Sequence, residues 1–114
     1  MLTPFEMAFV AHLFADWILQ NDWMALNKSN LLHPAAWIHS GIHGVLLGII
    51  LGWPAGIVLG ITHALIDTRV PIRWWSRIYG KTCNGEIGMF LATWFDQVLH
   101  IVVIALWIGI VGVA

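Results

Sequence analysis

Four pairs of ionisable side chains, each spaced four residues apart, constrain the fold of this chain more than any other feature. The pairs are His12 and Asp16, His39 and His43, His63 and Asp67, and Asp96 and His100. Residues four apart lie on the same face of a helix, so both members of a pair can bind one ion. A random order of the chain's histidines and acidic residues would give about one histidine-containing pair at this spacing. We therefore predict four helices whose polar faces meet around one buried polar or metal site.

Each pair lies in a different apolar segment, which predicts a membrane protein. The chain is 60% hydrophobic and 10% charged, which exceeds the apolar content that a soluble domain needs for its core. We expect an all-α integral membrane bundle of four transmembrane helices, with residues 1–114 forming a single domain. A net charge of −1 argues against a nucleic-acid partner, which requires a basic face. The start of the chain lacks the basic residues of a cleaved signal peptide, so the first helix is expected to be retained.

Caps, glycines and prolines give the expected helix boundaries. Thr3, Pro4 and Glu6 form the pattern of a capping box, which predicts a helix start at Pro4. The four expected spans are residues 4–26, 34–52, 55–68 and 87 to the C-terminus. Glycines repeat every fourth residue through the second and third spans and predict their close packing in a tight hairpin. These glycines are Gly44, Gly48, Gly52, Gly56 and Gly60.

Basic residues predict the orientation in the membrane. Residues 69–81 hold four of the five basic residues, with aromatic and aliphatic residues between them. This pattern is typical of a short helix lying in the membrane interface, here between the third and fourth spans. Lys28 would lie on the same side, so the positive-inside rule predicts cytoplasmic basic loops and both termini outside. No lysine or arginine is expected among the buried pairs as a counter-ion.

The paired residues predict a divalent metal site. Imidazole and carboxylate together suit zinc, manganese, iron or nickel, and we expect one or two ions, with zinc favoured. The expected ligands are His12, Asp16, His39, His43, His63, Asp67, Asp96 and His100. Asp16, His63 and Asp96 are the candidate catalytic residues. Residues expected to support the ligands or to contact a substrate are Gln20, Gln97, His33, Arg69, Arg73 and Arg77. The single cysteine, Cys83, is not expected to be a primary ligand.

The order of these motifs resembles that of a known family. The succession His12-x-x-x-Asp16-Trp17-x-Leu19-Gln20, Lys28, His33, Thr62-His63-x-x-x-Asp67 and Asp96-Gln97-x-x-His100 is similar to small bacterial and phage membrane proteins of the domain-of-unknown-function 3307 family. The resemblance implies an integral membrane protein, and we expect a multi-pass protein of the bacterial inner membrane. The spacings also resemble, more loosely, membrane-bound metal-dependent hydrolases related to zinc phospholipase C and P1 nuclease.

Three classes of function fit this pattern. The first is a metal-dependent hydrolase of a lipid or lipid-linked phosphoester, in which arginines after Thr68 would hold the anionic headgroup. The alternative is a non-enzymatic protein that binds or conducts metal ions or protons through the same interior. A haem-binding bundle is disfavoured by the carboxylates. Membrane lipid is the expected partner, and self-association through glycine or aromatic faces is also expected. In the plainest interpretation, the pairs only satisfy one another by hydrogen bonds across helices.

Overall fold

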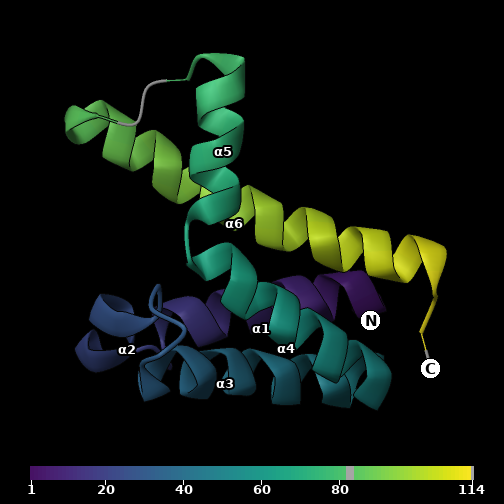
Figure 1. Ribbon diagram of the computed structural model, residues 1–114. Coiled ribbons are helices and arrows are strands. Elements are labelled where there is room, and N and C mark those ends of the chain that lie inside the picture. Colours follow the sequence, from purple (N-terminus) through teal and green to yellow (C-terminus); the bar gives the residue numbers. More distant parts are fainter. Residues whose placement is uncertain (82–83, 114) are drawn as a thin grey trace.

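The chain folds into helices throughout the described part, as predicted. The computed structural model describes residues 1–81 and 84–113, and no strand occurs there. The helices are α1 (Pro4–Trp17), α2 (Asp22–Asn27), α3 (Pro34–Leu51), α4 (Trp53–Asp67), α5 (Val70–Tyr79) and α6 (Gly85–Ile110) (Figure 1). The helices α1 and α4 both pack against α3, and α6 contacts α1 and α4. In Figure 1, α5 projects away from the layer formed by α1, α3 and α4.

The first predicted span is wrong in its length. The predicted capping box is present, since Glu6 N donates to Thr3 Oγ1 and Thr3 N donates to Glu6 Oε2. However, α1 ends at Trp17, and Asn21 caps a separate helix, α2, by accepting a hydrogen bond from Met24 N at 3.0 Å. Consecutive polar residues from Gln20 onward supply this cap and stop the helix. At 14 residues, α1 is about 21 Å long and is shorter than the hydrocarbon core of a bilayer.

Within residues 1–81 and 84–113, two helices, and not four, are long and apolar enough to cross a membrane by themselves. They are α3, with 18 residues, and α6, with 26 residues. The pair α4 and α5 would count as a third span if taken together, and its two halves are bent by 59°. The bend occurs at Arg69, which has a left-handed backbone with φ of 67°. The short helix predicted within residues 69–81 is therefore present as α5, and its position in the membrane interface stays a prediction.

Glycine determines how closely α3 and α4 approach. Their boundaries agree with the predicted ones to within two residues, and Gly52 turns the chain between them with φ of 103°. A Cβ atom added to Gly56 would lie 2.6 Å from Gly44 O and 2.8 Å from Gly48 Cα. Because both neighbours are backbone atoms, neither can move without separating the helices. This close approach brings the polar faces of α3 and α4 together.

We expect Gly56→Ala to destabilise the protein by about 1–3 kcal/mol, because the added methyl group overpacks a backbone contact. Gly41→Ala is the matched control, since a Cβ at Gly41, also in α3, meets no atom within 4 Å. Thermal unfolding in detergent, followed by circular dichroism, measures both variants. Equal melting temperatures for the two variants would contradict the close contact.

Candidate metal centre

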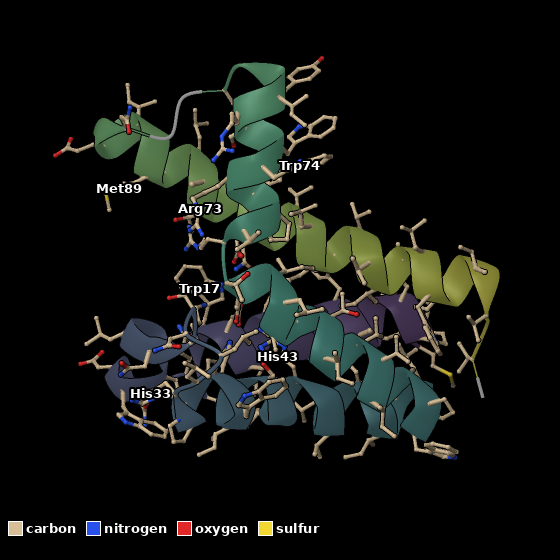
Figure 2. The ribbon with its side chains drawn as sticks, in the orientation of Figure 1. Trp17, His33, His43, Arg73, Trp74 and Met89 are labelled. Atoms are coloured by element: carbon tan, nitrogen blue, oxygen red, sulfur yellow. The ribbon has the colours of Figure 1, made fainter. Side chains whose placement is uncertain are left out.

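The structure brings the four predicted pairs together from four different helices. Each helix contributes both members of one pair: α1, α3, α4 and α6 in sequence order. None of the eight residues is more than 5% exposed. Figure 2 shows His43 on the inner side of α3, between the ribbons of α1 and α4. The predicted convergence on one buried site is therefore present, and the role of each residue as a ligand stays a prediction.

One group of four side chains is arranged around Asp16. Its Oδ1 atom lies 2.9 Å from His43 Nε2, 3.1 Å from His39 Nε2 and 3.9 Å from His63 Nε2. One ligand atom from each of these four residues lies within 4.8 Å of all the others. Three imidazole nitrogens and a carboxylate oxygen are a donor set that zinc accepts in its usual four-coordinate sites. This group could hold a metal ion.

A second group shares His63 with the first. The Nε2 atom of His63 lies 3.0 Å from Asp67 Oδ2, and the Nε2 atom of His100 lies 3.1 Å from Asp67 Oδ1. These three residues also meet the geometric requirement for holding a metal ion. The ring of His63 is stacked between the rings of His43 and His100, with centroid distances of 3.6 and 4.0 Å. His63 is thus the residue that connects the two groups.

Gln97 joins α6 to the first group. Its amide Nε2 donates to Asp16 Oδ2 at 2.9 Å. This contact orients the amide so that its Oε1 atom faces His12 Nε2, also at 2.9 Å. Since the oxygen can only accept, His12 Nε2 must carry the proton in this arrangement. His12 therefore acts here as a hydrogen-bond donor to Gln97, and Gln97 bridges His12 and Asp16. The predicted supporting role of Gln97 in a metal site stays a prediction.

Several polar atoms in the cluster lack a hydrogen-bond partner within the described residues. They include Asp96 Oδ1 and the Nδ1 atoms of His39 and His43. Asp67 Oδ2 also lacks a hydrogen bond, although it lies 3.0 Å from His63 Nε2 as an ion-pair contact. Unpartnered polar atoms are costly when buried, and carboxylate oxygens facing imidazole Nε2 atoms are the arrangement that a cation would satisfy. Asp96 lies at the edge of the cluster, with its Oδ1 atom 3.6 Å from His100 Nε2. The donor set therefore fits a divalent ion.

Sequence reasoning missed one basic residue at the site. Lys28 Nζ lies 4.0 Å from Asp67 Oδ1, and its side chain is only 14% exposed. The expectation that no lysine or arginine would act as a counter-ion is therefore wrong. The cause is the early end of α1, because α2 then packs against α3 and returns the chain toward the end of α4. No local pattern around Lys28 could have indicated this contact.

The other predicted supporting residues lie apart from the cluster contacts. His33 caps α3, where its Nδ1 atom accepts from Ala35 N at 3.1 Å, and its ring lies against Trp23. Gln20 Oε1 is buried without a partner in the described part of the chain. The arginines of α5 and its cap lie beyond the end of α4, and Cys83 lies outside the described residues. Roles for these residues in a site remain predictions.

Little free space adjoins the ligand atoms. A cavity of about 10 Å³ touches His12, His63 and His100. This is roughly the space that one water molecule requires. A larger substrate would have to approach the cluster from a neighbouring groove.

Comparison with known proteins identifies the family. The family model described as "Protein of unknown function (DUF3307)" matches residues 5–113, which confirms the resemblance seen in the motifs. No curated protein and no solved structure matches the chain. Since the family match extends over nearly all of its length, the chain belongs to the DUF3307 family.

Proposed function

We propose that this protein is a membrane-embedded metalloprotein that hydrolyses a lipid or lipid-linked phosphoester with one or two divalent ions, most favourably zinc. The observation that carries the proposal is that the Nε2 atoms of His39, His43, His63 and His100 all lie within 3.1 Å of an oxygen of Asp16 or Asp67. Four helices supply these groups, and rings on facing helices rarely turn the same nitrogen toward the same carboxylates for packing alone.

The cluster contains groups suited to phosphoester hydrolysis. A divalent ion bound there would supply a Lewis acid for the phosphoryl oxygen. In the reaction, the oxygen of water adds to phosphorus and the ester P–O bond breaks. Water loses one proton and the leaving alcohol gains one, so the protons balance. We assign the uptake of the proton from water to Asp96, whose Oδ1 atom has no hydrogen-bond partner in the described residues, and the neighbouring His100 would share that proton.

Localisation follows from the same reasoning. The apolar helices α3 and α6 are compatible with a membrane protein, and we propose the bacterial inner membrane as its location. Lys28 lies beside the end of α4, from which Arg69 follows directly. These basic residues therefore share one end of the molecule, which we assign to the cytoplasmic side.

A second function is favoured by one observation. The ionisable groups form an unbroken series across the bundle, from His43 through Asp16, His39, His63, Asp67 and His100 to Asp96, with each neighbouring pair 3.6 Å or less apart. Such a series could pass protons between opposite faces of the cluster. Proton flux into liposomes that contain the protein tests this function. A flux that persists in the presence of a chelator and is abolished in His63→Ala would favour conduction over hydrolysis.

Elemental analysis of the detergent-purified protein tests the metal proposal. We expect one or two zinc ions per chain, and removal by a chelator should lower the melting temperature, because a bound ion stabilises only the folded state. Incubation with phosphatidic acid should then release inorganic phosphate in the zinc form and not in the chelated form. The proposal would be contradicted if the protein contains no stoichiometric divalent ion and the chelator leaves its melting temperature unchanged.

A further inference from the structure

Two cavities adjoin on α6, outside the metal cluster. The first is a groove of about 650 Å³ between α1 and α6, lined mostly by apolar side chains that include Leu13 and Trp17. The second is a pocket of about 280 Å³ between α5 and α6, lined by Arg69 and Arg73 among others. Met89 and Thr93 line both. The apolar groove therefore ends in a cationic pocket.

The two arginines in the pocket have no acidic partner in the described ranges. Among lysine and arginine side chains in those ranges, the ion pair with a carboxylate is the one between Lys28 and Asp67. Arg69 and Arg73 lie one helical turn apart, and guanidinium groups bind phosphate through paired hydrogen bonds. Figure 2 shows Arg73 extending from α5 toward the side of the molecule that carries Trp17 and Met89. The unpaired charge therefore lies at the end of the groove.

Backbone strain marks the same place. Within residues 1–81 and 84–113, Arg69 is the one non-glycine residue with a positive φ. A left-handed backbone is unfavourable for such a residue and persists where the surrounding structure requires it. Here it bends α5 away from α4, and this bend opens the pocket against α6.

We propose that the groove and the pocket together bind one anionic phospholipid. Its phosphate lies between Arg69 and Arg73, and an acyl chain follows the groove between α1 and α6. The charge of the pocket selects an anionic headgroup over a zwitterionic one. The groove volume lies within the range of about 300–1,000 Å³ that ligand pockets usually have. Arg77 does not line the pocket. Of the three arginines predicted to contact a headgroup, we therefore assign this contact to Arg69 and Arg73 only.

The same groove gives the lipid a connection to the metal cluster. Gln97 lines the groove and hydrogen-bonds with both Asp16 and His12. A lipid held in the groove therefore lies one side chain away from the first metal group. The part of the lipid beside Gln97 is its acyl chain and not its phosphate, so the inference goes beyond the proposed hydrolysis by assigning a separate binding site for an anionic phospholipid, and it does not rest on that reaction.

Native mass spectrometry of the full chain tests the binding step. The probes are phosphatidylglycerol, phosphatidylcholine with identical acyl chains, and glycerol 3-phosphate, each added to metal-loaded and to chelated protein. We expect one tightly bound phosphatidylglycerol in both forms and weak retention of the other two probes. The double variant Arg69→Gln with Arg73→Gln should weaken phosphatidylglycerol binding by at least about tenfold, because each charge near a headgroup is worth about fivefold in affinity and two such charges are removed. Arg77→Gln, with the same charge change on the same helix, should leave it within about twofold.

A second pair of variants tests the groove. Thr93→Trp should fill the junction between groove and pocket and abolish retention, whereas Leu91→Trp, at a position on α6 that lines neither cavity, should not. Equal retention of both lipids, equal binding of glycerol 3-phosphate, or a change of oligomeric state in place of lipid loss would overturn the inference. Selective binding of phosphatidylglycerol by a zinc form that releases no phosphate from phosphatidic acid would contradict the proposed hydrolysis alone. Phosphate release from phosphatidic acid without selective binding of phosphatidylglycerol would contradict this site alone.

Discussion

His63→Ala is expected to remove essentially all bound metal, and His43→Ala only part of it. His63 belongs to both groups that could hold an ion, whereas His43 belongs to the first alone. His63→Ala therefore leaves three possible ligands in the first group and two in the second. Loss of residues that merely orient ligands already costs metal sites about 10–100-fold in affinity, so the loss of a shared ligand should cost at least that.

Elemental analysis after size-exclusion chromatography measures the metal content of each variant. His33→Ala is the matched control, because His33 is a histidine that caps α3 away from the cluster. It should retain the wild-type metal content. If His63→Ala remains monodisperse, helical and fully loaded with metal, the two-group centre is wrong. Equal losses in His63→Ala and His43→Ala would instead indicate a single ion bound by the first group.

Helix positions could be predicted where a cap or a glycine marks the end of an apolar segment. The start of α3 at Pro34, the turn at Gly52 and the separate helix after Arg69 all have such marks. The break after Trp17 has a weaker mark, because the apolar residues Ile18 and Leu19 continue the helical pattern and separate the break from the cap at Asn21. Its cause is the cap at Asn21, which competes with continuation of the helix by satisfying the first amides of α2. The prediction of four spans failed because α1, with 14 residues, and α4, with 15, are too short to count as spans by themselves.

Convergence of the site could be predicted because one spacing recurs in four apolar segments. The partner of each side chain could not, since partners depend on the rotation and depth of each helix. Gln97 was a candidate only because it borders Asp96, and the structure directs it toward α1, where it meets Asp16. The contact of Lys28 with Asp67 depends on the fold of α2 and had no local signal. Spacing thus predicts which residues share a face, and packing decides what that face meets.

Asp16→Asn is expected to reduce phosphate release from phosphatidic acid by about 10²–10⁴-fold, the range over which positioned acid–base and ligand groups act. Asparagine has nearly the same shape as aspartate but lacks its charge. The Oδ1 atom of Asp16 is the oxygen that His39 and His43 face, and its Oδ2 atom receives the Gln97 amide. The substitution therefore removes the carboxylate of the first group while preserving the packing of α1.

Asp22→Asn provides the control for this loss of one negative charge, because Asp22 lies in the first turn of α2, outside both groups that could hold a metal ion among the described residues. It should leave phosphate release within about twofold of wild type, a difference small against the expected loss. Metal content measured on the same samples separates two causes. Loss of both metal and activity makes Asp16 a ligand, whereas loss of activity with metal retained assigns it to the reaction itself. Wild-type release by Asp16→Asn would exclude the Asp16 carboxylate, the one carboxylate among the four members of the first group, from the hydrolysis.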